Sequence, residues 1–346
     1  MGSELLDYIA EWRKVTSHPT LFINPIQSHS YESHCGSSSR RAGGACVAGC
    51  REAQPKAGEV LVKIVAVGLN FADTVQAQGL YPGGPKPPYI PSLEFAGTIE
   101  GSGEKVMGLT NGGACAEFVA APRSALWPFP ATWSFEEAAA FPVNYLTAYF
   151  AYWRAGLLGE RKSASVLIHA AAGGVGTAAV QMGKILGITT IGTSSSAEKL
   201  ARAKELGLTY SINYKAEDYE TRVAEITNGR GVDGVFEMLG GEHTAKSTRC
   251  LAENGQIVIY GLATGEQPKF DFMSMFQKNA GAHALWITPL MKFPQLIGEA
   301  LKTSLEWGAS GKLRPVVGHT LPLEKAADGF RLMIERKNFG KVVLVV

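Results

Sequence analysis

From Gly58 onward the chain alternates apolar and polar residues in short runs, which predicts β-strands over residues 59–65, 95–99 and 104–108. Between the last two runs lies Gly101-Ser102-Gly103, a connection short enough for a tight hairpin with glycine at positive φ. Strand character returns over residues 341–345. We therefore expect a small, turn-rich β domain whose sheet is rejoined by the end of the chain.

From Ser134 the pattern becomes helical, with Ser134 as the N-cap of a helix over 138–153 that Pro142 can bend. A regular alternation follows. Strands are predicted over 166–169, 189–193, 210–213, 234–239 and 256–260, and helices over 175–186, 197–206, 218–227 and 242–252. Gly187 and Gly207 stand where C-cap glycines are expected. Strand–helix alternation at this spacing indicates right-handed crossovers and a parallel sheet.

The segment that joins the first of these strands to its helix reads AAGGVG over residues 171–176. A glycine-rich turn of this kind lets a pyrophosphate approach bare backbone and lie on the helix N-terminus. Gly173 and Gly176 hold the second and third positions of the dinucleotide fingerprint, and Ala171 stands at the first. The sequence therefore predicts a dinucleotide site, with Gly173 and Gly176 among its contacts.

The residues after the second strand of this sheet indicate which dinucleotide binds. NAD sites usually carry Asp or Glu there to bind the ribose hydroxyl, and this chain has none. Ser194 and Ser195 occupy the region, Lys199 follows on the next helix, and Tyr214 follows the third strand. Hydroxyls and a cation suit a 2'-phosphate, so we predict NADPH. The alternative is that Lys199 pairs with Glu198 or solvent and that the serines only cap a helix.

Composition excludes several other classes of function. The 346 residues carry a net charge of +2 without a long basic run, which argues against nucleic acid and anionic membranes as partners. Residues 164–183 are uncharged, but His169, Gln181 and four glycines in them disfavour a membrane span. No secretory signal pattern opens the chain, so a cytoplasmic location is expected, with mitochondrial import left as an alternative.

Residues 1–54 differ from the rest, because a Ser-, His- and Gly-rich stretch lacks hydrophobic periodicity, and we expect a poorly ordered leader. Five cysteines in a large chain suggest reduced thiols rather than disulfides. Cys46 and Cys50, with Cys35 and His34 nearby, could hold a metal, although their spacing matches no common zinc site. We therefore predict no metal.

Five motifs together resemble the zinc-independent quinone oxidoreductases, or zeta-crystallin-like proteins, of the medium-chain dehydrogenase/reductase superfamily. They are GEVLV at 58–62, GLNFAD at 68–73, QGLY at 78–81, AAAGGVG at 170–176 and GKVV at 340–343. The resemblance implies an α/β protein with a Rossmann doubly wound parallel sheet and a GroES-like β-rich catalytic domain. The Rossmann domain is assigned to residues 128–285 and the catalytic domain to 55–127 and 286–346. A homodimer is also implied.

In zinc-dependent relatives a Cys within Gly-x-Cys-x-x-Asp and a His within a Gly-His-Glu turn bind the catalytic metal, whereas this chain has Asn70 and Leu93 at those positions. The resemblance therefore implies metal-independent hydride transfer from NADPH to a quinone or an α,β-unsaturated carbonyl. Negative charge that develops on the substrate oxygen needs a hydrogen bond or a proton. Asn70 and Tyr81 are the candidates, with water as another proton source, and Asp73 is a further catalytic candidate expected to position the nicotinamide end.

Matching motifs extend the predicted cofactor contacts to Asn70, Thr147, Gly174, Val175, Tyr260, Gly261 and Lys341. Structural alternatives stay open, since Asn70 can cap a turn, Tyr81 can be a loop aromatic and Thr147 can bond its own helix. Family members also begin with a strand and hairpin that residues 1–54 do not show, which would leave an unpaired sheet edge. The second hypothesis is therefore a non-catalytic NADPH-binding protein with an incomplete catalytic domain.

Overall fold

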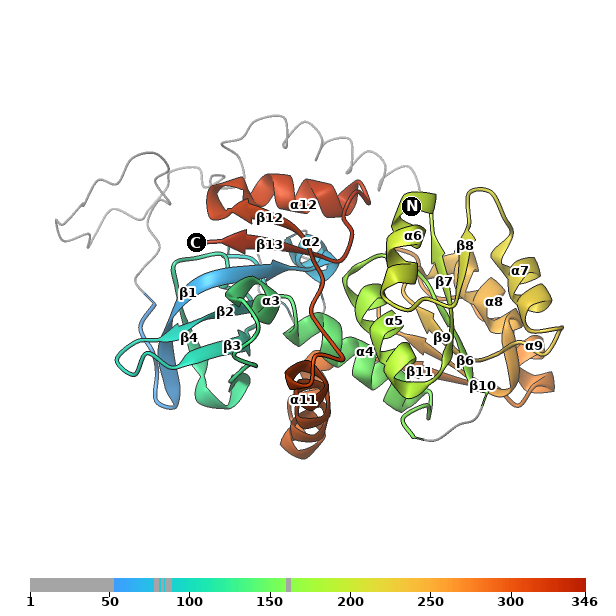
Figure 1. The fold of residues 1–346 in the computed structure, drawn as a ribbon, viewed down its shortest axis with the longest axis horizontal. Helices are drawn as coiled ribbons and strands as arrows, with labels where there is room; N and C mark the ends of the chain where they lie inside the picture. The colour runs from blue at the N-terminus through green and yellow to red at the C-terminus, as the bar shows by residue number, and fades with distance from the viewer. Residues whose placement is uncertain (1–52, 78–80, 82–83, 85–88, 160–162) are drawn as a thin grey trace.

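The computed structural model describes residues 53–77, 81, 84, 89–159 and 163–346. The predicted leader, residues 1–54, lies almost wholly outside this part of the chain, as do the proposed Cys and His metal ligands and most of the 78–81 motif. Within it, two separate sheets stand side by side with helix α4 between them (Figure 1). The architecture is α/β, as expected.

The first sheet contains seven strands in the order β12-β13-β1-β2-β3-β5, with β4 paired to β1. Its strands are β1 (Glu59–Leu69), β2 (Glu94–Ile99), β3 (Lys105–Leu109), β4 (Phe118–Pro122), β5 (Leu126–Trp127), β12 (Val317–Pro322) and β13 (Lys341–Val345). The predicted hairpin joins β2 to β3, with φ of 84° at Gly101 and 70° at Gly103. The C-terminal strand β13 pairs with β1, as predicted. The expected unpaired edge is not at β1, which pairs with β2, β4 and β13.

The second sheet is six-stranded and wholly parallel, in the order β11-β10-β9-β6-β7-β8. Its strands are β6 (Ser165–Ile168), β7 (Thr189–Ser194), β8 (Tyr210–Asn213), β9 (Val232–Glu237), β10 (Leu251–Ile259) and β11 (Gly281–Ala284). The helices between them are α5 (Gly174–Leu186), α6 (Ala197–Glu205), α7 (Tyr219–Ile226) and α8 (Gly241–Arg249). This is the doubly wound Rossmann-like sheet that the alternating pattern predicts.

Among the predicted boundaries that are wrong, those of two helices have a local cause. The helix over 138–153 is broken rather than bent: α3 (Phe135–Ala139) ends before Pro142, and α4 (Pro142–Arg154) begins at it. Proline lacks an N–H and is favoured at the first position of a new helix. The helix over 242–252 is too long, because α8 ends at Arg249 and Leu251 already pairs with Val232.

The remaining helices are α2 (Phe71–Ala77), α9 (Phe272–Gln277), α10 (Ile287–Leu290), α11 (Pro294–Ala309) and α12 (Ala326–Ile334), with short 3-10 turns at Arg123–Ala125 and Leu323–Lys325. Helix α4 is rich in buried aromatic side chains, among them Tyr145, Phe150 and Tyr152, and these pack into the largest hydrophobic cluster. Tyr152 also donates to the Ala179 carbonyl of α5 at 2.8 Å. Helix α4 therefore ties the nucleotide sheet's helix layer to the centre of the molecule (Figure 1).

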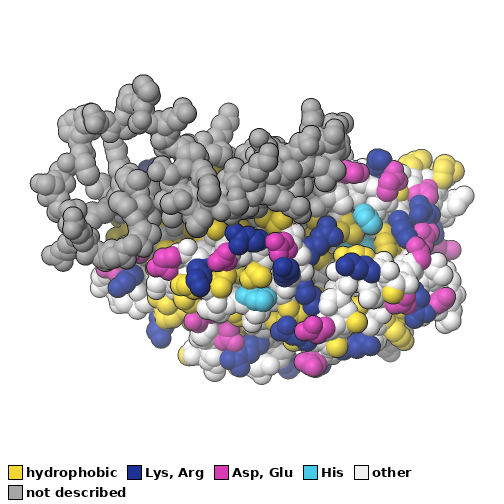
Figure 2. All heavy atoms as spheres, turned by 90° about the horizontal axis from the view of Figure 1, so that it is seen from above, with side chains coloured by type: hydrophobic (Ala, Val, Ile, Leu, Met, Phe, Trp, Pro, Cys, Tyr) yellow, Lys and Arg dark blue, Asp and Glu magenta, His cyan; other side chains and the backbone are white. Residues whose placement is uncertain are grey.

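On the face seen in Figure 2, the described residues mix basic and acidic side chains rather than separating them by sign. In the described ranges, none of the helices is long and apolar enough to cross a membrane.

Candidate active site

Asn70 stands at the turn where β1 ends and α2 begins, and its amide is bonded on both sides. Lys341 Nζ donates to Asn70 Oδ1 at 2.6 Å, and Asn70 Nδ2 donates to Glu94 Oε1 at 2.8 Å. Lys341 also forms an ion pair with Glu94. The backbone N–H of Asn70 donates to Asp73 Oδ2 at 2.7 Å. We call Asn70, Asp73, Glu94 and Lys341 the charged cluster, and each of them is at most 6% exposed.

Strand pairing brings these residues together from distant parts of the chain. Gly68 on β1 lies opposite Glu94 on β2 and Val343 on β13, close to Lys341. A Cβ at Gly68 would lie 2.8 Å from the Lys341 side chain and 2.9 Å from that of Glu94, so the close packing here requires glycine. The other carboxylate oxygen of Glu94 accepts from the Val143 N–H at the start of α4 at 2.7 Å. A helix N-terminus stabilises such a buried negative charge.

Asp73 is the member of the charged cluster with an incomplete set of partners. Its Oδ1 atom is buried and has no hydrogen-bond partner in the described structure. Burial raises the pKa of Asp73 to about 7, with Glu94 acting in the same direction, while the Asn70 N–H and Lys341 act against the rise. A carboxyl with this pKa can take up or release a proton near neutral pH.

Tyr81 and Thr147 complete the predicted catalytic region. Trp286 Nε1 donates to the Tyr81 hydroxyl at 2.7 Å, and the two rings meet edge to face at 5.8 Å. Burial raises the pKa of Tyr81, so the phenol keeps its proton and can donate it in a hydrogen bond. Thr147 lies within α4 and is 6% exposed. The Tyr81 hydroxyl is therefore held by a specific partner, Trp286.

The glycine loop after β6 leads directly into α5, which begins at Gly174 with Gly173 as its N-cap. The N-cap residue Gly173 has no side chain and makes no side-chain cap hydrogen bond, so it leaves the first N–H groups of α5 without such a cap. A Cβ at Gly176 would lie 2.2 Å from the Ala170 carbonyl oxygen, which explains the third glycine by close helix packing. Val175 is half-buried in the same turn. This backbone fits a phosphate group.

The segment before β13 joins this loop to the charged cluster. The Gly340 N–H donates to the Ala172 carbonyl at 2.8 Å, and Gly340 forms a bridge with Gly173. Lys341, the next residue, is predicted to contact the cofactor, yet its ammonium points to Asn70 and Glu94. The phosphate loop and the charged cluster are therefore connected through two consecutive residues.

The predicted 2'-phosphate residues lie around the start of α6. Ser196, not Ser194 or Ser195, caps this helix by accepting from the Lys199 N–H at 3.3 Å. Lys199 Nζ donates to the Arg336 carbonyl at 2.6 Å and to the Asn338 carbonyl at 2.7 Å, rather than pairing with Glu198. An ammonium has three donors, and two of those of Lys199 are used by these carbonyl groups.

The remaining predicted contacts border the same end of the sheet. Tyr214 is 39% exposed, and its N–H donates to the Ser194 carbonyl at 3.2 Å. Tyr260 and Gly261 follow β10, and the Tyr260 N–H donates to the Glu237 carbonyl at the end of β9 at 3.0 Å. All these residues follow the carboxyl ends of parallel strands, where open α/β sheets bind ligands.

Known protein families match both halves of the chain. The family described as "Alcohol dehydrogenase GroES-like domain" matches residues 56–131, and "Zinc-binding dehydrogenase" matches residues 174–302. "Synaptic vesicle membrane protein VAT-1 homolog" of Danio rerio is 35% identical over 314 residues, covering 84% of this chain and 64% of that protein. "Quinone oxidoreductase-like protein 2 homolog" of Nematostella vectensis is 34% identical over 299 residues, covering 83% of this chain and 81% of that protein.

A solved structure matches this chain over nearly the whole length of the solved protein. The quinone oxidoreductase of Thermus thermophilus, whose structure is known alone and in complex with NADPH, is 37% identical to this chain with a TM-score of 0.78. The match covers 86% of this chain and 95% of that one. The chain belongs to the quinone oxidoreductase family of the medium-chain dehydrogenase/reductase superfamily. The resemblance drawn from the motifs is thereby confirmed, together with the GroES-like assignment of the first sheet.

Sequence reasoning about this quinone oxidoreductase family member missed two residues of its site. Glu94 is the partner of both Asn70 and Lys341, and the signal for it was a single carboxylate at the start of an otherwise uncharged strand. Gln76 lies one helical turn after Asp73 and is completely buried, and its amide nitrogen and oxygen have no partner in the described structure. The spacing of three residues from Asp73 could have placed it on the same face of α2.

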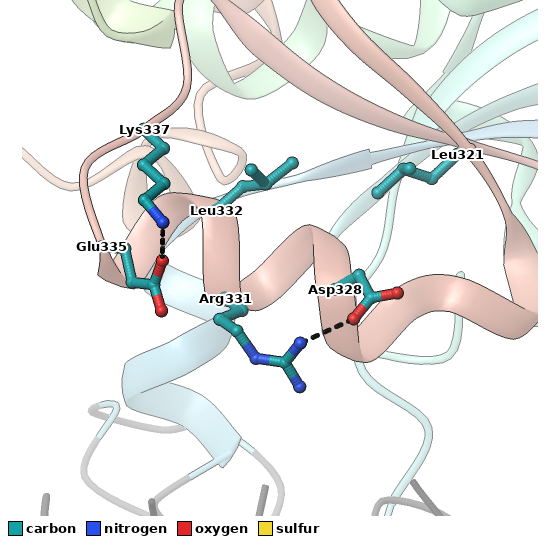
Figure 3. A pocket seen from close by; sticks show the side chains of 6 residues that line it. All are labelled: Leu321, Asp328, Arg331, Leu332, Glu335 and Lys337. Carbon is teal, nitrogen blue, oxygen red and sulfur yellow. Dashed lines mark hydrogen bonds and ion pairs between the residues drawn. The ribbon is translucent and has the colours of Figure 1, made fainter. Parts of the chain in front are cut away.

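The pocket drawn in Figure 3 lies away from the predicted site residues. The pocket drawn in Figure 3 has a volume of about 310 Å³ and lies on α12, where Arg331 pairs with Asp328 and Lys337 pairs with Glu335. None of the residues predicted for cofactor or catalysis lines it. Among the described residues, no group of three or more His, Cys, Asp or Glu side chains could hold a metal ion.

Proposed function

We propose that this chain is an NADPH-dependent, metal-independent reductase that transfers a hydride to quinones or α,β-unsaturated carbonyls. The observation that carries the proposal is the backbone link between the uncapped phosphate loop and the charged cluster, through Gly340 and Lys341. It joins a site that fits a dinucleotide to buried polar groups suited to catalysis. The Thermus relative, which binds NADPH, supports the same function.

NADPH supplies the hydride, and this chain's residues bind and orient it. The N–H groups of Gly174, Val175 and Gly176 at the start of α5 suit the pyrophosphate. Ser194, Ser195, Lys199 and Tyr214 suit the 2'-phosphate, which is why we propose NADPH over NADH. Thr147, Tyr260, Gly261 and Asp73 are assigned to the nicotinamide end.

Asn70 and Tyr81 are proposed to stabilise negative charge on the substrate oxygen. One N–H of Asn70 is committed to Glu94, while the other has only a long contact of 3.5 Å to the Gly68 carbonyl, so it is the N–H available to a substrate. Lys341 holds the amide oxygen and so fixes the orientation of this donor. The Tyr81 hydroxyl accepts from Trp286 and has Thr288 as a second hydrogen-bond partner, and we propose that it donates its own proton to the substrate oxygen. Preorganised donors of this kind favour the charged state without rearrangement.

The proposed metal independence rests on the residues that replace the zinc ligands of the alcohol dehydrogenases. Asn70 offers an amide that is already bonded to Lys341 and Glu94, and Leu93 offers no ligand atom. Neither side chain binds zinc as a thiolate or an imidazole does. A conjugated acceptor suits such a site because its carbonyl needs little activation.

A homodimer is proposed through the free edge of the nucleotide sheet. Strand β11 ends that sheet and pairs with β10 on one side. Helix α9, just before it, exposes Phe272 at 69% and Phe276 at 70%. An open strand edge beside exposed aromatic rings favours association. We also propose a cytoplasmic location, in keeping with the free thiols of Cys115 and Cys250.

The direct test follows NADPH oxidation at 340 nm with 9,10-phenanthrenequinone, beside matched runs with NADH and with the variants Asn70→Ala and Tyr81→Phe. We expect turnover that prefers NADPH and falls in both variants. No turnover above buffer across a panel of quinones and enones would contradict a reductase. NADPH that raised the melting temperature without turnover would favour the second hypothesis, a non-catalytic NADPH-binding protein.

A further inference from the structure

A continuous chain of hydrogen bonds crosses the nucleotide sheet beneath the proposed cofactor site. Thr193 Oγ1 lies 3.1 Å from His169 Nδ1, and His169 Nε2 lies 2.9 Å from Ser247 Oγ. Ser247 donates to Glu237 Oε2 at 2.7 Å. All four side chains are at most 1% exposed. We call these four residues the relay. Hydroxyl groups and an imidazole connect its members, and it contains no Lys–Glu pair.

The hydrogen positions in the relay follow from its chemistry. The Ser247 hydroxyl has one hydrogen, which it donates to Glu237, so it must accept from His169 Nε2–H. Nδ1 of the neutral imidazole is then bare and accepts from the Thr193 hydroxyl. Burial lowers the pKa of His169, which keeps the ring neutral. Tyr219 packs edge to face against the ring at 5.0 Å and covers it.

Each end of the relay holds a loop at the carboxyl edge of the sheet. Glu237 Oε1 accepts from the Leu239 N–H at 2.5 Å and from the Gly240 N–H at 3.4 Å, fixing a turn in which Gly240 has φ of 83°. Thr193 directly precedes Ser194, and the Thr193 carbonyl accepts from the Ala171 N–H at 3.0 Å. His169 itself precedes the phosphate loop. Strand β6 lies between β9 and β7, which is where the strand order of the sheet reverses.

We infer that Thr193, His169, Ser247 and Glu237 act together as positioning residues that hold the loops after β6, β7 and β9 in the arrangement that binds the dinucleotide. The inference rests on the proposed function and deepens it. Each polar atom of the relay that faces another member is bonded, and rotating one side chain breaks the bond to the next. Cutting the relay at one end therefore disturbs the loop at the other end.

The test compares isosteric threonine substitutions on one strand. Thr193→Val removes the relay hydroxyl, and Thr193→Ser keeps it. Thr190→Val is the matched control, because Thr190 is also a buried threonine of β7 but bonds to Thr209, about 10 Å from Thr193 along the strand. Ser247→Ala cuts the relay beside Glu237. The dissociation constants of NADPH and of adenosine 2',5'-bisphosphate, which lacks the nicotinamide half, are measured by calorimetry with melting temperatures alongside.

We expect Thr193→Val to weaken NADPH binding about fivefold, Thr193→Ser to restore it, and Thr190→Val to change it less than about twofold at a similar loss of melting temperature. Ser247→Ala should weaken the binding of adenosine 2',5'-bisphosphate as well, although Ser247 lies beside Glu237, at the far end of the relay from Thr193. A Ser247→Ala effect confined to the intact dinucleotide, or equal effects of the two valine variants, would overturn the inference. Wild-type protein that bound no NADPH would overturn the proposed function itself.

Discussion

The charged cluster of the catalytic sheet and the relay of the nucleotide sheet are both buried polar networks, yet they contain different kinds of interaction. The cluster places a Lys–Glu ion pair beside a carboxyl group, one oxygen of which has no hydrogen-bond partner among the described residues. The relay connects hydroxyls and an imidazole to one carboxylate, and the bonds between its members are complete. We propose that the first network stabilises charge during the reaction and that the second fixes the geometry of the cofactor loops.

The largest expected effect comes from breaking the cluster's ion pair. Lys341→Met leaves Glu94 buried without its cation, which should lower the free energy of unfolding by about 3–5 kcal/mol in urea titrations. The double variant Lys341→Met/Glu94→Leu removes both charges and should recover most of that loss. A single variant as stable as the wild type, or a double variant no better than the single one, would show that the cluster is not held by charge.

The cluster should also become less stable as pH rises. The pKa of Asp73 is raised to about 7 in the fold from 3.8, so the folded chain keeps a proton that the unfolded chain loses between these values. Between pH 4 and pH 7 the free energy of unfolding of the wild type should therefore fall by several kcal/mol relative to that of Asp73→Asn. Above pH 7 the difference should not grow further. Parallel unfolding curves for the two proteins across this range would contradict the buried protonated carboxyl.

The relay should respond to pH in the opposite direction. Burial lowers the pKa of His169, Glu237 opposes this shift, and His243 and Lys246 act in the same direction as burial. The stability that the neutral ring contributes is present above pH 6.5 and is lost as pH falls below it. Unfolding of the wild type and of His169→Gln should therefore converge at acidic pH. A stability difference that grew on acidification would be inconsistent with a neutral buried ring.

The smallest expected effect is at Trp286, whose hydrogen bond to Tyr81 belongs to neither network. Trp286→Phe keeps an aromatic ring but removes the indole N–H. The lost hydrogen bond should raise the activation free energy by about 1 kcal/mol, which lowers kcat/KM for the quinone roughly fivefold. NADPH affinity should stay unchanged, since the indole N–H bonds to Tyr81 rather than to the loops that the relay holds. Steady-state kinetics with varied quinone and with varied NADPH separate the two effects, and a loss in NADPH affinity would remove the distinction.

The sequence pattern predicted those features that depend on residues close together in the chain. Strand and helix alternation over residues 166–260 and the glycine loop could be predicted because periodicity and the need for small residues are written in neighbouring positions. The partners of Lys341 could not, since Asn70 and Glu94 lie 271 and 247 residues away and meet it only through strand pairing. The relay was missed for the same reason, as Ser247 is 78 residues from His169. Lys199 shows a mixed outcome, because its position near α6 was foreseen but its carbonyl partners were not.

One measurement tests the division between the two regions most directly: kcat and the KM for NADPH, determined side by side for Asn70→Ala and Thr193→Val with a quinone acceptor. Asn70→Ala should lower kcat with little change in KM, because it removes a donor for charge that develops during the reaction. Thr193→Val should raise KM with little change in kcat, because it loosens the loops that bind the cofactor. If both variants changed the same parameter, charge and geometry would not be divided between the two networks, and the account would be wrong.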